Sequence, residues 1–291
     1  MYDSVRQNFM AFSTLFEGRV PYMYLDVKAL VTIGVGNLID PMNLALPLPF
    51  VFKSNPSTAA TQDDITADWN TVKNDPALAQ QGHLAADPIT KLMLTDDSIN
   101  SLVLAKADQF ESVLKQTAEF SSVDTWPADA QLGLMSMAWA MGPAFGQPPN
   151  WPTFRSACAA QDWNAAAQNC RIDETGNPGV APRNAADRVL FLDAAQMASN
   201  QSDFSVLQYT LSGSRATIRS GSSGDNVTFL QTRLQTLGYT TEVNGTFDDV
   251  TNQAVMSFQT DNQLPADGVV GPVTWAALGT SVAASSSTGG Q

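Results

Sequence analysis

Apolar residues recur at helical spacing along most of the chain, which predicts a largely helical protein with one small β region. The stretch Val5–Phe16 has this spacing and leads into Glu17 and Gly18. The stretch Pro21–Leu38 instead combines tyrosines and β-branched residues with glycines, which indicates strands joined by tight turns. The proline-rich stretch Asp40–Pro56 predicts a loop or lid, because proline interrupts a helix.

Further helix signals follow. Thr61 and Asp64 stand at the spacing of an N-cap and capping box, and Thr95 precedes another stretch with helical spacing. The run WPADAQLGLMSMAWAMG, residues 126–142, is apolar on every side and predicts a buried helix. Residues 183–198 predict a last amphipathic helix before the composition becomes rich in serine and glycine.

The two cysteines, Cys158 and Cys170, lie in a segment that predicts two short helices around a turn at Gln161–Asp162. Antiparallel helices there would allow a disulfide if the protein works outside the cytoplasm. Two buried free thiols are an equal alternative, and the sequence does not separate them.

The C-terminal part of the chain contains an internal repeat with a period of 23 residues. The stretch beginning at Asn244–Gly245 matches the stretch beginning at Asp267–Gly268, and each is a turn followed by a short helix. One copy cannot bury its own apolar face, so the two copies must share a core with the helix predicted over Val227–Leu237. We therefore expect an all-α three-helix domain over 223–280, after a Ser/Gly-rich linker at 206–222 and before a disordered tail at 281–291.

Charge and hydropathy exclude several classes of function. The formal net charge is −13, with twelve basic and 22 acidic side chains in residues 1–212 and three and six in the remainder. Neither part has the basic footprint of a nucleic-acid or anionic-membrane binder. No stretch approaches the roughly 18 apolar residues of a membrane span, and the N-terminus lacks the pattern of a signal peptide. We expect no membrane and no nucleic-acid partner.

His83 is the only histidine, and this limits the chemistry of any active site. Most histidine-ligated zinc sites need two or three histidines, and a Ser-His-Asp or Cys-His arrangement would have to use this one residue. It stands in a polar, loop-like stretch, which favours a surface histidine. We expect no metal and no cofactor.

One constellation suits catalysis. Glu17 ends the first predicted helix, Asp26 lies between predicted strands, and Thr32 follows within a strand. A helix end packed on a hairpin can bring two carboxyl groups to face each other. Glycosidic cleavage needs one carboxyl that donates a proton and a second that activates water or acts as nucleophile.

The segment FEGRVPYMYLDVKALVTIGVGNLID, residues 16–40, closely resembles the catalytic segment of the phage-type lysozymes, glycoside hydrolase family 24. The family pattern is Glu-Gly, a short strand, Asp, and then Thr-Ile-Gly-x-Gly. Residues from Arg183 resemble the family's basic helix that returns near the glutamate. The resemblance spans roughly residues 5–200, and Asn37 stands where the family has a histidine that supports the hairpin.

The resemblance implies an α+β lysozyme-like domain over 1–205, with a hairpin lobe and a helical lobe. It implies hydrolysis of the β-1,4 bond between N-acetylmuramic acid and N-acetylglucosamine with inversion. Glu17 would be the general acid, and Asp26 would position water with help from Thr32. Arg183 and Asn37 would support these groups. Carboxyl groups roughly 6.5–9.5 Å apart suit inversion.

The C-terminal repeats resemble the peptidoglycan-binding domain found on many wall hydrolases. The elements L-Q-x-x-L, A-V-x-x-F-Q and D-G-x-x-G-x-x-T-W occur together, with Asp248 in place of a usual glycine. The resemblance implies noncatalytic binding of peptidoglycan in a shallow groove that Asp267, Gly268 and Trp275 could line. Alternatively, Trp275 is a core residue of the third helix.

Together these resemblances predict a monomeric peptidoglycan hydrolase, made in the cytoplasm and acting on the wall in the periplasm. A phage lysis enzyme released through a holin and an injected antibacterial effector are both open, and the effector would have an inhibitor or immunity protein as partner. A lytic transglycosylase and a noncatalytic wall-binding protein are the alternatives to the hydrolase.

Overall fold

The computed structural model describes residues 1–175, 180–201, 203–209 and 217–278, and its contacts divide the chain into two units. The sheet unit comprises Ser13–Gln109, and the helical unit comprises Met1–Phe12 and Phe110–Gln291. Residues 210–216 of the predicted linker and the predicted tail at 281–291 lie outside the described residues. The predicted domain boundaries therefore stay a prediction. Among the described helices, none combines the length and apolar character that a membrane span requires.

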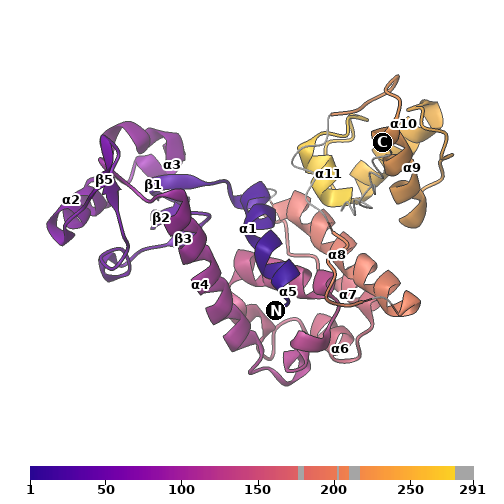
Figure 1. Ribbon diagram of the computed structural model, residues 1–291, viewed down its shortest axis with the longest axis horizontal. Helices are drawn as coiled ribbons and strands as arrows, with labels where there is room; N and C mark the ends of the chain where they lie inside the picture. Colours follow the sequence, from indigo (N-terminus) through magenta and orange to yellow (C-terminus); the bar gives the residue numbers. More distant parts are fainter. Residues whose placement is uncertain (176–179, 202, 210–216, 279–291) are drawn as a thin grey trace, which may run out of the picture. The chain divides into compact units, whose positions relative to one another are not determined.

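The sheet unit contains the end of helix α1 (Asp3–Glu17) and a three-stranded antiparallel sheet. The strands are β1 (Val20–Leu25), β2 (Val31–Gly34) and β3 (Asn37–Leu38), in the order β1-β2-β3 (Figure 1). This confirms the predicted helix followed by short strands. Each connection between these strands is only a few residues long, so the turns help to determine how the strands pair.

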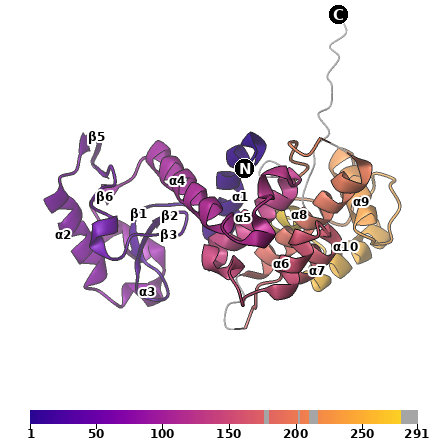
Figure 2. The same cartoon turned by 90° about the horizontal axis from the view of Figure 1, so that it is seen from below.

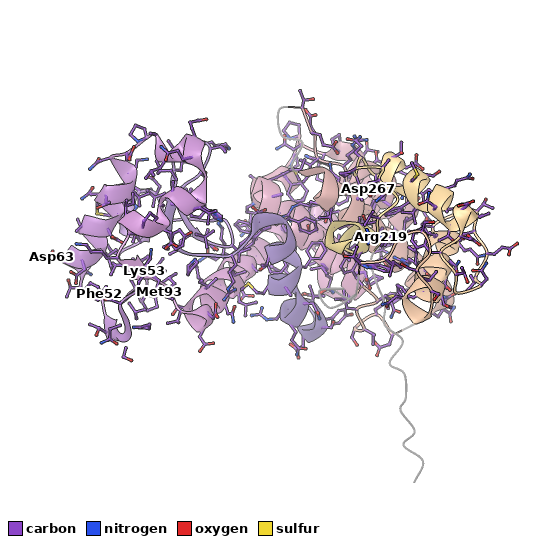
Figure 3. All side chains as sticks on the ribbon, turned by 90° about the horizontal axis from the view of Figure 1, so that it is seen from above. Phe52, Lys53, Asp63, Met93, Arg219 and Asp267 are labelled. Carbon is purple, nitrogen blue, oxygen red and sulfur yellow. The ribbon has the colours of Figure 1, made fainter. Side chains whose placement is uncertain are left out.

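A second antiparallel sheet begins within the end of the stretch that was predicted as a loop or lid. Its order is β5-β4-β6, formed by β4 (Val51–Phe52), β5 (Asn55–Ala59) and β6 (Leu92–Met93). Phe52 and Met93 of this sheet and Lys53, which follows β4, are labelled close together in Figure 3. The loop prediction was wrong here, because β4 is only two residues long and its partner β6 lies about 40 residues further along the chain.

Helices of the sheet unit begin where the sequence places their caps. Helix α2 (Gln62–Lys73) has the predicted capping box, in which Thr61 and Asp64 each accept a hydrogen bond from the backbone of the other. Helix α4 (Asp96–Leu114) follows Thr95, whose hydroxyl accepts from the Ser98 amide at 3.2 Å. Between them lie α3 (Leu78–Gln81), η2 (His83–Ala85) and η3 (Asp87–Ile89), while η1 (Met42–Leu44) precedes β4.

The helical unit is built around α5 (Ala128–Met141), in which every residue from Ala128 to Trp139 is buried, as predicted. It packs against α8 (Ala181–Asn200) (Figure 2). The shorter helices are η4 (Ala118–Phe120), η5 (Val123–Thr125), η6 (Pro143–Gly146), α6 (Pro152–Ala159) and α7 (Trp163–Asn169). Cys158 and Cys170 are buried free thiols, and burial raises the pKa of each.

Helix α8 is not amphipathic in the way the sequence predicted. Three of its four charged residues are buried with its apolar ones, and each of the three is 4% exposed or less: Arg183, Asp187 and Asp193. The Arg183 Nη1 donates to the carbonyl and hydroxyl of Ser136 on α5, at 3.1 and 3.0 Å. Burial raises the pKa of Asp187 to about 7. The amphipathic prediction failed because these charged positions lie in the interior. Partners on neighbouring helices can compensate the burial of Arg183 and Asp193.

The C-terminal segment, residues 217–278, contains the three predicted helices α9 (Asp225–Thr236), α10 (Asp249–Asp261) and α11 (Pro272–Leu278). They share one apolar core centred on four fully buried residues, Leu230, Leu234, Phe258 and Trp275. Ile218, which lies on the predicted linker, also belongs to this core and exchanges backbone hydrogen bonds with Val270. Arg233 of α9 forms a buried ion pair with Asp193 of α8 at 2.6 Å.

Each repeat of the C-terminal segment is held by a buried glutamine on the preceding helix. The Gln231 side chain donates to Asn244, Thr246 and Thr251, and its carbonyl accepts from the Asn244 and Gly245 amides.

The second glutamine repeats this arrangement. The Gln259 side chain donates to Asp267, Val269 and Thr274, and it accepts from the Gly268 amide. The 23-residue sequence repeat is therefore also a repeat of one hydrogen-bond network.

Candidate functional site

Glu17 and Asp26 line one open cavity of about 310 Å³ in the sheet unit. The residues that line it, here called the carboxylate pocket, are Glu17, Val20, Tyr24, Leu25, Asp26, Val27, Ala79, Gly82 and His83. Two carboxyl groups, a phenol and an imidazole thus meet at one accessible surface. The volume lies at the lower end of the roughly 300–1,000 Å³ that small-molecule pockets occupy.

The position of Glu17 depends on the end of α1 and on Gly36. Gly18 follows Glu17 with φ of +71°, which ends the helix directly after the carboxyl-bearing residue. A Cβ on Gly36 would lie 3.2 Å from Glu17 Oε2, and Gly36 itself has φ of +70°. Glycine is required at Gly36 both by the backbone conformation and by the closeness of the carboxyl group.

Asp26 is fixed by the turn that joins β1 to β2. Its Oδ1 accepts from the Lys28 amide at 2.8 Å and the Leu30 amide at 2.9 Å. This arrangement orients the carboxyl group without using a second side chain. The described residues donate no hydrogen bond to Oδ2.

Tyr24 lies on β1 and lines the same pocket as these carboxyl groups. Burial, together with the negative charges of Glu17 and Asp26, raises its pKa to about 12. Lys106 on α4 is a cation close enough to Glu17 for the negative charge of that carboxyl group to act on it. Burial lowers the pKa of Lys106, and Glu17 partly opposes this. Tyr24 and Lys106 were not among the predicted site residues, because nothing in their local sequence marks them.

Thr32 and Asn37 lie in the adjoining hairpin and do not line the pocket. Thr32 is buried opposite Tyr24 in the β1–β2 ladder, and its hydroxyl donates to the Leu30 carbonyl at 3.2 Å. Asn37 is buried, and its Oδ1 accepts from the Val35 amide at 3.2 Å. Its Nδ2 has no hydrogen-bond partner among the described residues. The roles predicted for these two residues stay predictions.

His83, which its polar sequence context predicted to be a surface residue, lies half-buried at the open carboxylate pocket. It is the first residue of η2, and its imidazole packs edge-to-face on Tyr24 with ring centres 6.0 Å apart. The sequence could not show this, because His83 reaches the pocket through the tertiary fold. No group of three or more candidate metal ligands occurs among the described residues.

Arg183 belongs to the helical unit, where it donates to the carbonyl and hydroxyl of Ser136. The predicted support of Glu17 by Arg183 therefore stays a prediction.

The predicted wall-binding residues take different positions in the C-terminal segment. Asp267, labelled in Figure 3, is exposed, while Gly268 is buried and its amide donates a hydrogen bond to the Gln259 side chain. Trp275 is fully buried, and its ring centre lies 6.3 Å from that of Phe229. This favours the alternative that Trp275 is a core residue. Asp248, the departure from the family pattern, is the N-cap of α10 and accepts from the Thr251 amide at 2.8 Å.

Comparison with known proteins concerns the C-terminal segment. Residues 223–278 match the family model described as "Putative peptidoglycan binding domain". The N-acetylmuramoyl-L-alanine amidase CwlM of Mycobacterium tuberculosis is 50% identical over 56 residues, which are 19% of this chain and 14% of that protein. A crystal structure of a peptidoglycan-binding protein from Clostridioides difficile, in complex with glutamine hydroxamate, is 44% identical. It covers 22% of this chain and 40% of that one, with a TM-score of 0.22.

These matches place a peptidoglycan-binding domain at residues 223–278 and support an association with the cell wall. The chain spans less than half the length of either relative. The family match leaves residues 1–222 outside it, so the resemblance of that region to phage-type lysozymes stays a prediction.

Proposed function

We propose that this protein is a peptidoglycan hydrolase of the muramidase type. The observation that carries the proposal is the shared pocket of Glu17 and Asp26, in a chain that also has a peptidoglycan-binding domain. The sequence and spacing of residues 16–40, which resemble the catalytic segment of the phage-type lysozymes, also support peptidoglycan as the substrate. The catalytic and binding parts of the chain thus point to one polymer.

In the proposed reaction, Glu17 donates its proton to the glycosidic oxygen that leaves. Asp26 removes a proton from water as that water attacks the sugar from the opposite face. Its turn hydrogen bonds hold Oδ1, so Oδ2 is the oxygen placed to accept this proton. Thr32 would help to orient the water, and the product would have inverted configuration.

The C-terminal segment would keep the glycan near the pocket. Binding of the polymer by one part of a chain raises its concentration at the other part without any added contact in the pocket. The net charge of −13 means that contacts with an anionic wall must come from hydrogen bonds and shape. We propose the wall as the site of action, reached by phage-directed release or by injection from another cell.

A Glu17→Gln variant tests the proposed acid directly. We expect it to bind purified wall sacculi as the unchanged protein does, while clearing of cell suspensions falls about 10²–10⁴-fold, the usual contribution of a general acid. Mass spectrometry of the digest should show reducing muramic ends with the unchanged protein. Anhydro-muramic ends would instead indicate a transglycosylase, and binding without any cleavage would indicate a noncatalytic wall-binding protein.

A further inference from the structure

We infer that His83 and Tyr24 form a binding subsite for one N-acetylated sugar ring beside the two carboxyl groups. This inference rests on the proposed function, because it names residues that would hold that substrate. His83 and Tyr24 come from different elements, η2 and β1, and meet on the wall of the carboxylate pocket. Their edge-to-face contact fixes the two rings relative to each other.

The imidazole has hydrogen-bonding capacity that the described protein does not use. None of the described residues forms a hydrogen bond with the His83 side chain, although that side chain is half-buried. A neutral imidazole offers one donor and one acceptor. A sugar hydroxyl or acetamido group offers the complementary pair, and pairing both imidazole nitrogens would compensate the partial loss of water.

The surroundings of His83 favour a neutral, ring-shaped ligand. The pocket is lined by two carboxyl groups, which disfavours an anionic ligand, and also by the small residues Ala79 and Gly82. Val27, which is 84% exposed, adds an apolar surface at the mouth. Apolar surface next to a few directional polar groups is the arrangement that small-ligand sites share.

The uniqueness of His83 gives a direct test, because all imidazole NMR signals of the chain come from this residue. The full-length Glu17→Gln variant is titrated with a β-1,4-linked N-acetylglucosamine hexamer. We expect saturable shifts of the His83 ring signals together with the Asp26 amide. Shifts at Asp26 with unchanged His83 signals overturn the inference, and so does the absence of any shift at millimolar hexamer.

Kinetics on solubilised glycan strands provide the second test. His83→Ala should raise KM about tenfold with kcat unchanged within about twofold, as expected for lost hydrogen bonds of substrate binding. His83→Asn, which retains a donor and an acceptor, should raise KM only about threefold. Leu84→Ala is the matched control, because Leu84 is the next residue, 72% exposed and outside the pocket lining.

The outcomes separate this inference from the proposed function. If the His83 signals shift but the unchanged protein cleaves no glycosidic bond, the subsite stands and the muramidase proposal fails. If the protein cleaves glycan while His83→Ala leaves KM unchanged or lowers kcat alone, the muramidase stands and the subsite fails.

Discussion

The C-terminal segment and the carboxylate pocket both gather polar side chains around tight turns, but these side chains have different partners. In the C-terminal segment, Gln231 and Gln259 are buried and bond the turn amides and hydroxyls around them. In the pocket, the turn at Asp26 uses only one carboxyl oxygen, and the imidazole of His83 bonds none of the described residues. Internal pairing stabilises a fold, whereas accessible unpaired groups are available to a ligand.

The largest effect is expected where internal pairing is removed. Gln231→Leu leaves the partly buried amides of Asn244 and Gly245 without their acceptor, at a cost of about 1 kcal/mol each, the lower end of the range for an unsatisfied donor. We expect α9 and α10 to lose most of their protection in hydrogen–deuterium exchange, while cleavage of soluble glycan persists. Gln253→Leu, the same change at an exposed position of α10, is the control. Equal protection in both variants would show that the glutamine network does not hold the segment.

A smaller effect is expected at Gly36, where the pocket rather than the fold should suffer. Gly36→Ala costs about 1–2 kcal/mol from the left-handed backbone and also places a methyl group against Glu17. Gly18→Ala has the same backbone cost, with no atom within 4 Å of the new Cβ. Thermal unfolding should therefore shift equally in the two variants, while activity falls about tenfold further in Gly36→Ala. Equal activities of the two variants would show that the close approach of Gly36 to Glu17 does not matter for activity.

The smallest effect is expected at the cap of α10. Hydrogen bonds from Thr251 and Asn244 lower the pKa of Asp248, so its contribution to stability is present at neutral pH and is lost as the pH falls through the lowered pKa. Asp248→Ala should increase exchange of the Thr251 amide at neutral pH. Asp248→Asn keeps a capping oxygen and should remove only the acid dependence. If Asp248→Asn loses stability with falling pH as the unchanged protein does, another carboxyl group is responsible for that loss.

Local signals in the sequence predicted much of the fold. The capping box at Thr61, the buried α5 and the repeated turns of the C-terminal segment depend on neighbours in the chain, and each is found as predicted. Asp248 shows that a departure from a family pattern can be read physically, because aspartate is a good N-cap.

What the sequence missed depends on contacts between distant residues. The sequence predicted an amphipathic helix where α8 buries most of its charges, and β4 is too short to predict without its partner β6. In the candidate site, the meeting of Glu17 with Asp26 was predicted, but Tyr24, His83 and Lys106 were not. Their part in the site arises from tertiary packing.

The two buried thiols have a practical consequence. Alkylating reagents attack the thiolate, and burial raises the pKa of both Cys158 and Cys170, so the folded chain should be almost inert to maleimides. A cysteine added on the surface of the sheet unit and another on the C-terminal segment would then be labelled selectively with a pair of dyes. Energy transfer between the dyes would then report whether the distance between these two parts changes when glycan strands are added.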